Sequence, residues 1–315
     1  MPLSISTLNV ENLSKPKPSE SEAKKQQYKQ RLSLLRDIIF RLDADILALQ
    51  ELISPKALDD LFGLNFPSPF QPYKKPYVIG KPAERGVRCA VLSRFESGPK
   101  IDHETVAKFT WPDRGIEWQL EWDRPLLQVP VKVNSNLVIT LFVVHLKSKM
   151  VTFPTGVDYS RYEWPNLKYY AQGSFLSTLR RVGQAMDLRE KLDAVFERDP
   201  EANIVVLGDF NDGLGSVTLD TIVGDHIGAN NTKLWDFELV PCELSLPTEK
   251  QYTYIFRGKG IMLDHILISK NMLPFFKFAT VYNELLKEEH VPYRGEKFFS
   301  EPDHAPVIAY FTYQP

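Results

Sequence analysis

The stretch Ile204–Gly213, IVVLGDFNDG, decides how the rest of the sequence is interpreted. Its four leading apolar residues are typical of a buried strand, and Gly208 is followed by an acid, an aromatic residue, an amide and a second acid. Because strand side chains alternate, Asp209 and Asn211 are expected on one side if the strand continues past Gly208. Gly208 is expected to leave room for a close approach to its backbone. A turn that closes a strand has the same composition, so the other strand ends must be compared.

Composition places the chain among globular proteins with a large core. It has 315 residues, of which 43% are hydrophobic and 25% charged, and its net charge is -2. This charge excludes a globally basic surface, so any contact with nucleic acid depends on a local patch. No low-complexity linker divides the chain, which predicts a single domain over residues 1–315.

The cysteines and the N-terminus bound the compartment. Cys89 and Cys242 are far apart in sequence, and no disulfide framework or cysteine-based zinc site can be inferred from them. No apolar run is long enough for a transmembrane segment, and the N-terminus lacks the basic start and apolar stretch of a signal peptide. We expect a cytoplasmic protein or the mature form of a secreted one.

Periodicity predicts many strands and few long helices. Helical spacing covers residues 23–42, 54–63 and 174–197, and residues 150–172 are expected to form an aromatic loop over one face. Strand patterns cover residues 3–10, 46–52, 88–95, 125–133, 137–146, 203–210, 252–258, 262–269 and 306–313. This composition of elements favours sheet packed on sheet, with helices outside.

Polar residues end or begin six of these strands. They are Asn9 and Glu11, Glu51, His145, Asp209 and Asn211, Asp264, and Asp303 with His304. Each is unremarkable alone, but together they predict a cluster of carboxylates, amides and imidazoles if the strand ends converge. Such a cluster suits Mg²⁺ or Mn²⁺, which would neutralise a phosphate, and its histidines suit proton transfer near neutral pH.

The chain resembles the endonuclease/exonuclease/phosphatase superfamily, which has the fold of pancreatic-type deoxyribonuclease. The resemblance rests on TLNVEN, LALQE, VVHLKS, VVLGDFND, LDHILIS and PDHAPV, which occur in the family's order and span residues 7 to 309. It implies an α+β fold, a four-layer α/β/β/α sandwich in which two packed mixed β-sheets are flanked by helices.

The resemblance also implies roles. The metal ligands would be Glu51, as the main one, with Asn9, Glu11 and Asp303 nearby. His304, oriented by Asp264, would activate water or hold the scissile phosphate. Asp209 and Asn211 would position the nucleophile and a phosphate oxygen. His145 would protonate the leaving oxygen or stabilise the phosphorane. Arg124 and Lys147 would contact a substrate phosphate.

Three nearby residues have plainer interpretations. Arg180 and Arg181 are interpreted as solvated charges on a helix. His265 is expected to pack beside Asp264.

The expected function is metal-dependent hydrolysis of DNA or RNA, as in bacterial nucleases of the superfamily. Abasic-site endonucleases have Tyr where this chain has His145, and inositol-phosphate phosphatases have Arg where it has His265. The aromatic segment leaves open a sphingomyelinase-like phospholipid diesterase or a small-molecule phosphatase. A binding module without activity is the third alternative. No stable protein partner is expected.

Overall fold

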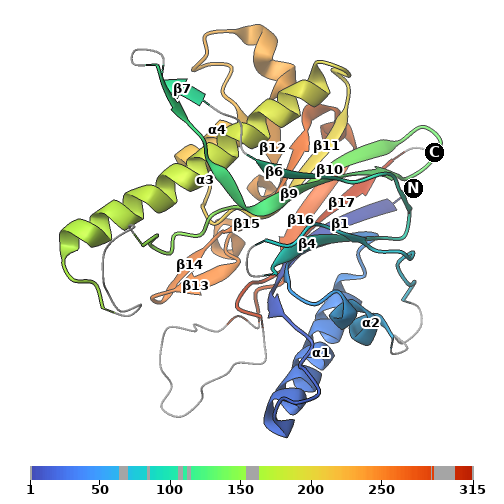
Figure 1. Ribbon diagram of the computed structural model, residues 1–315. Helices are drawn as coiled ribbons and strands as arrows, with labels where there is room; N and C mark the ends of the chain where they lie inside the picture. The colour runs from blue at the N-terminus through green and yellow to red at the C-terminus, as the bar shows by residue number, and fades with distance from the viewer. Residues whose placement is uncertain are drawn as a thin grey trace.

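A computed structural model describes residues 2–63, 70–83, 86–105, 109–111, 115–153, 163–284, 286 and 302–313. Figure 1 shows two β-sheets lying against each other, with α1 and α2 on one side and α3 and α4 on the other. The helices are α1 (Glu22–Leu42), α2 (Lys56–Phe62), α3 (Leu167–Phe196) and α4 (Val217–Val223). Short 3₁₀ helices follow at Thr232–Phe237, Cys242–Ser245, Thr248–Lys250 and Lys270–Phe275. Over the described ranges, no helix combines the length and apolar character that a membrane crossing needs.

The first sheet has six strands. Their order is β16 (Phe276–Val281), β17 (Val307–Thr312), β1 (Pro2–Leu13), β2 (Ile46–Leu52), β4 (Arg88–Ser93) and β3 (Val78–Ile79). The central pair, β1 and β2, is parallel, and the other neighbours are antiparallel.

The second sheet repeats this plan. Its order is β12 (Leu239–Pro241), β15 (Asp264–Ser269), β11 (Asn203–Asp209), β10 (Val138–His145), β9 (Glu121–Lys132) and β5 (Glu96–Ser97), with β6 (Ile101–Thr105) also paired to β9. Again one pair, β10 and β11, is parallel. Two hairpins lie outside the sheets: β7 (Phe109–Trp111) with β8 (Ile116–Trp118), and β13 (Tyr254–Phe256) with β14 (Lys259–Ile261).

Alternating apolar side chains hold the four layers together. In β2, Ile46 and Ala48 enter the core between the sheets, whereas Leu47 and Leu49 pack with α1 and α2. In β11, Val205 and Leu207 face the other sheet, and Ile204 and Val206 face α3 and α4. Both faces of these strands are therefore buried, which explains why they are continuously apolar in sequence. The predicted α/β/β/α sandwich of two mixed sheets is confirmed.

Helix α3 differs from its prediction. It begins at Leu167, inside the predicted loop 150–172, of which residues 154–162 lie outside the described part of the chain. Asn166 caps it by accepting a hydrogen bond from the Tyr169 N–H at 3.0 Å. Its buried face is polar or small over the first half, and includes Gly173, Ser177, Arg181 and Gln184.

The two parallel pairs fix where polar side chains gather. The carboxyl ends of β1 and β2 meet the carboxyl ends of β10 and β11, because the two sheets are stacked. His145 is opposite Asp209 in the β10–β11 register, and Asp209 is opposite Asp264 in the β11–β15 register. One edge of the sandwich thus collects the ends of strands from both sheets.

Candidate active site

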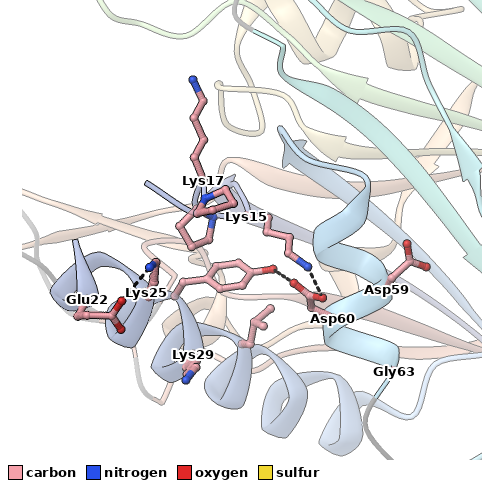
Figure 2. Close-up of a pocket in the computed structure, with 12 residues that line it drawn as sticks. Lys15, Lys17, Glu22, Lys25, Lys29, Asp59, Asp60 and Gly63 are labelled. Carbon is pink, nitrogen blue, oxygen red and sulfur yellow. Dashed lines mark hydrogen bonds and ion pairs between the residues drawn. The ribbon is translucent and has the colours of Figure 1, made fainter. Parts of the chain in front are cut away.

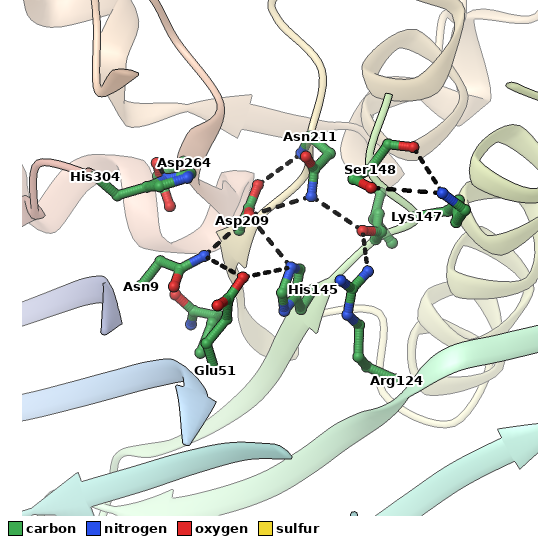
Figure 3. A network of polar contacts seen from close by, with 12 residues as sticks. Asn9, Glu51, Arg124, His145, Lys147, Ser148, Asp209, Asn211, Asp264 and His304 are labelled. Carbon is green, nitrogen blue, oxygen red and sulfur yellow. Dashed lines mark hydrogen bonds and ion pairs between the residues drawn. The ribbon is translucent and has the colours of Figure 1, made fainter. Parts of the chain in front are cut away.

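Side chains from four strand ends contact one another at this edge (Figure 3). The amide nitrogen of Asn9 lies 3.3 Å from Oε1 of Glu51 and 3.2 Å from Oδ2 of Asp209, donating to both. Nε2 of His145 lies 3.4 Å from Oδ2 of Asp209 and 3.7 Å from Oε1 of Glu51. The structure therefore brings together residues that are up to 200 positions apart in the chain.

A backbone irregularity aims Glu51 at the cluster. The pairing of β2 shifts register with β4 between Leu49 and Leu52 and with β1 between Gln50 and Leu52, and Glu51 has a φ of 62°. Its Oε2 accepts a hydrogen bond from the Asn12 N–H at 2.9 Å. A positive φ at a non-glycine residue costs about 1–3 kcal/mol, and bulges of this kind often redirect a side chain beside a reactive site.

The GDFN turn places Asp209 and Asn211. Strand β11 ends at Asp209, one residue before the predicted end at Phe210, and Asn211 has a φ of 53°. The Asn211 N–H donates to Oδ1 of Asp209 at 2.8 Å, and its side-chain amide donates to Asp209 Oδ2 and to the Leu146 carbonyl, each at 3.1 Å. Phe210 turns to the opposite face and is buried under α3 and α4.

Gly208 is required by the packing of the parallel pair. It has a φ of 139°, and a Cβ atom there would lie 2.1 Å from the carbonyl oxygen of Val144. The group that approaches its backbone is therefore the neighbouring strand β10.

His304 and Asp264 form a buried pair beside Asp209. Nδ1 of His304 lies 2.7 Å from Oδ2 of Asp264. Burial alone would lower the pKa of His304, but the carboxylates of Asp264 and Asp209 raise it well above its ordinary value. The two carboxylates therefore favour the protonated ring, with Nδ1–H donated to Asp264. Ligand atoms of Asp209, Asp264 and His304 all lie within 4.8 Å of one another.

The site has an excess of buried negative charge. Burial raises the pKa of Asp209 to about 7, with Asp264 and Glu51 adding to the effect while His304 opposes it. Burial likewise raises the pKa of Asp303, which is also affected by Glu51 and Asp264. Oδ1 of Asp264 and Oδ1 of Asp303 are buried and have no hydrogen-bond partner within the described ranges.

These groups fit a hard divalent cation. The donors are carboxylate and amide oxygens, which Mg²⁺ and Mn²⁺ prefer, and a cation would compensate the crowded acids. The residues that could hold such an ion are Glu51, Asp209, Asp264, Asp303, His304 and Asn9, of which Asp209, Asp264 and His304 have ligand atoms within 4.8 Å of one another.

His145 differs electrostatically from His304. It is 2% exposed, and burial together with the positive charges of Arg124 and His304 lowers its pKa well below its ordinary value. It is therefore neutral. Arg124 approaches from β9 and donates from Nη1 to the Leu146 carbonyl at 3.2 Å, next to His145.

Two predicted residues point elsewhere. Figure 3 shows the Lys147 side chain directed towards Ser148, and its ammonium donates to the carbonyls of Ser148 at 3.1 Å and Met150 at 3.0 Å. The carboxylate of Glu11 pairs with Arg31 of α1 at 2.5 Å, while its N–H donates to Oδ1 of Asn9 at 2.9 Å. Glu11 thus orients Asn9 through its backbone.

Comparison with known proteins bears on the family and the fold. A family model described as "Endonuclease/Exonuclease/phosphatase family" matches residues 162–306, which include Asp209, Asp264 and His304. This part of the chain, residues 162–306, is therefore similar in sequence to the endonuclease/exonuclease/phosphatase family. No curated protein matches it in sequence.

Solved structures share the superfamily fold along nearly the whole chain. Truncated TDP2 of Caenorhabditis elegans has 16% identity and a TM-score of 0.57, with 98% of this chain and 97% of that chain covered. A mannosyl-6-phosphatase of Bacteroides thetaiotaomicron has 17% identity and a TM-score of 0.56, covering 99% and 100%. The human Nocturnin catalytic domain with bound sulfate has 16% identity and a TM-score of 0.55, with 99% of this chain and 95% of that chain covered. At these identities the likeness shows the fold.

Arg181 braces the site, contrary to the interpretation as a solvated charge. It is 5% exposed; its Nε donates to Asp212 Oδ2 at 3.1 Å and its Nη1 to the Lys147 carbonyl at 3.2 Å. Asp212 also binds Lys149 and Thr218, each at 2.8 Å. Arg181 therefore ties the segments after His145 and Asn211 to α3. Arg180 is paired with Asp123 at 2.5 Å and is about one-third exposed.

His265 supports the same turn from behind. It does not pack against Asp264, because neighbouring residues of a strand point to opposite faces. Its Nε2 donates to the carbonyl of Asp212 at 2.8 Å, and its Nδ1 contacts Glu243, which is also fully buried. Burial opposes protonation, but Glu243 raises the pKa of His265 above its ordinary value.

A cleft of about 550 Å³ lies away from this edge, between α1, α2 and the segment after β1 (Figure 2). Its cations are largely compensated, since Lys15 and Tyr28 both bind Asp60 and Lys25 pairs with Glu22. Figure 2 shows Lys17 and Lys29 pointing away from each other. This cleft does not resemble a phosphate site.

Proposed function

We propose that this protein is a divalent-metal-dependent phosphodiesterase that hydrolyses DNA, with RNA as the related substrate. The observation that carries the proposal is the meeting of Asn9, Glu51, His145 and Asp209 with the Asp264–His304 pair at one edge. A phosphate carries negative charge and these acids would repel it, so hydrolysis at this site requires a cation.

Glu51, Asp209, Asp264 and Asp303 would hold the ion, which would give a partner to the buried Oδ1 atoms of Asp264 and Asp303 that have none within the described ranges. Bound there, it supplies charge neutralisation for the phosphate and for the developing transition state. Asn9 donates to Glu51 and Asp209 and fixes their carboxylate orientation.

The protein groups divide the remaining work by charge. Asp264 accepts the Nδ1–H of His304 and favours its protonated ring, which would donate from Nε2 to a phosphate oxygen. Asp209 and Asn211, which are joined by hydrogen bonds, would position the attacking water and a phosphate oxygen. His145, neutral and beside Arg124, lies opposite Asp209 and donates to the leaving oxygen. Arg124 supplies positive charge for a substrate phosphate.

One feature favours polynucleotides. Phe153 and Trp164 stack with ring centroids 5.0 Å apart beside α3, and aromatic rings of this kind can stack on bases.

The second candidate substrate class is a phospholipid or a small phosphoester. Leu167, Tyr170 and Phe175 are exposed at 85%, 46% and 61% along the first half of α3. Exposed apolar and aromatic side chains on one helix are also found on proteins that act at membranes. The shared fold includes a mannosyl-6-phosphatase, so a small phosphoester belongs in the test.

An activity panel separates these classes. Purified protein is assayed with Mg²⁺ or Mn²⁺ on plasmid DNA, single-stranded DNA, RNA, choline-phospholipid liposomes and inositol phosphates. E51Q and H304A are the test variants, and E20Q and H103A are their matched controls, since Glu20 and His103 make only peripheral contacts.

We expect cleavage of DNA that falls by about 10²–10⁴-fold in E51Q and H304A and is unchanged in the controls. Faster turnover of liposomes or inositol phosphates, with the same variant dependence, would transfer the assignment to the second class. Equal activity of wild type and both test variants would refute the site.

A further inference from the structure

Thr253 joins the two chain segments that carry Asp264 and His304. It is fully buried and lies in the turn immediately before β13. Its hydroxyl oxygen accepts hydrogen bonds from the N–H groups of Leu263 at 3.0 Å and Asp264 at 3.1 Å. Its carbonyl accepts from the Ala305 N–H at 2.8 Å. One residue thus bonds the backbone of Asp264 and the residue after His304.

The Thr253 hydroxyl supplies a hydrogen-bond acceptor for two buried backbone N–H groups. The N–H groups of Leu263 and Asp264 are at the start of β15, where the β11 register begins at Asp264. A hydroxyl has two acceptor lone pairs, and here both are used by backbone donors. Without the hydroxyl, two buried N–H groups would lose their partner, and each costs about 1–3 kcal/mol when unsatisfied. Asp264 would then move to find water or another acceptor.

The turn that carries Thr253 is itself anchored. The Asn283 side-chain amide donates to the carbonyls of Lys250 at 3.2 Å and Tyr252 at 2.9 Å, and the Thr253 N–H donates to the Ile261 carbonyl at 2.9 Å. The next residue, Tyr254, places its ring 5.2 Å from the imidazole of His304. Thr253 is therefore a fixed point rather than a group that follows its neighbours.

We propose that Thr253 is a positioning residue that holds the Asp264–His304 pair in its reactive geometry. The role in catalysis rests on the proposed function, whereas the effect on the 2.7 Å Asp264–His304 contact does not. Thr253 makes no contact with substrate; it acts through the two backbones that it joins.

The variants are Thr253→Val, which keeps the shape and removes the hydroxyl, and Thr253→Ser, which keeps the hydroxyl. Thr221→Val is the matched control, because the Thr221 hydroxyl donates only to the Val217 carbonyl of its own helix. Crystal structures of all three, and ¹⁵N NMR of the histidine rings for variants that do not crystallise, report the Asp264–His304 contact without any activity assay.

We expect the contact to remain at 2.7 Å in T253S and T221V and to open beyond hydrogen-bonding distance in T253V. An intact contact in T253V would overturn the positioning role even if the enzyme were inactive. If T253V does not fold, T253S with an opened contact would equally overturn it, because the hydroxyl alone would then not hold the pair.

Kinetics on the substrate found in the panel test the consequence. We expect kcat of T253V to fall about 10–100-fold with KM changed less than about twofold, and T253S to recover most of kcat. In an Asp264→Ala background, adding T253V is expected to have no further effect, since both changes disable one unit. Independent, multiplicative losses would contradict the inference. A wild type that hydrolyses nothing would instead refute the proposed function and leave the structural result to decide on Thr253.

Discussion

Replacing Arg181 by methionine is expected to destabilise the protein far more than replacing its neighbour Arg180. Methionine retains the aliphatic part of the side chain and removes the guanidinium. Arg181 is 5% exposed and donates to Asp212 and to the Lys147 carbonyl, whereas Arg180 is about one-third exposed and makes one ion pair with Asp123. The two variants therefore compare a buried and a surface arginine on the same helix.

The magnitude follows from the bonds lost. Each hydrogen bond to a charged group contributes about 1.5–3 kcal/mol, and R181M loses two. Asp212 keeps Lys149 and Thr218 as partners, so no isolated buried charge is left. We expect a loss of about 3 kcal/mol for R181M. R180M is expected within about 1 kcal/mol of wild type, since exposed ion pairs contribute little and Gln184 still donates to Asp123.

Equilibrium denaturation with guanidinium chloride measures both values, as the difference in unfolding free energy from wild type at constant slope. R181M is also expected to lower kcat by about tenfold, because the segments after His145 and Asn211 lose their common anchor. Equal stabilities of R181M and R180M would refute the assignment of Arg181 as a buried brace.

Three further changes test other parts of the structure. Gly208→Ala is expected to prevent stable folding, with a cost above about 4 kcal/mol, because the new Cβ would meet the Val144 carbonyl. In Gly215→Ala the new Cβ would have no atom within 4 Å, so only the positive φ is expected to cost stability, about 1–2 kcal/mol. Thermal unfolding compares the two variants. Burial raises the pKa of Glu238, but hydrogen bonds from His226 and Lys270 outweigh burial and lower this pKa to about 2. The carboxylate therefore stabilises the fold above the unfolded pKa of about 4.3, and this stabilisation is lost as pH falls towards 2. Glu238→Gln is therefore expected to flatten the fall in unfolding free energy between pH 5 and pH 2.5, and a slope equal to that of wild type would contradict this. His265→Gln is expected to lower stability and kcat together, since it leaves Glu243 buried without its partner, and an unchanged melting temperature would argue against that buried pair.

The layers could be predicted because burial leaves a periodic trace. Strands β2 and β11 are apolar on both faces, and the polar residues that follow them stand out against that background. Glu51, His145 and Asp209 each end such a strand, and their convergence follows from the stacking of two parallel pairs. This part of the site depends on strand direction, which the sequence pattern and the family resemblance already restrict.

The supporting residues could not be predicted in the same way. Arg181 and Gln184 occupy a buried helix face whose neighbours are backbone carbonyls and N–H groups, so the face is polar and periodicity of apolar residues misses it. Thr253 lies in a turn, where a buried hydroxyl and a solvated one have the same sequence. The direction of the Glu11 and Lys147 side chains depends on Arg31 and on the carbonyls of Ser148 and Met150, contacts that sequence spacing does not specify.

The central claim is that Glu51, Asp209 and their neighbours form a single site that binds a divalent cation. The most direct measurement is a titration of the purified protein with Mn²⁺. Calorimetry and the electron paramagnetic resonance signal of free Mn²⁺ report the binding for wild type, E51Q, D209N and the control E20Q. We predict saturable binding in wild type and E20Q that weakens at least about tenfold in E51Q and in D209N. Equal Mn²⁺ affinity in all four proteins, or no binding to wild type, would contradict the account.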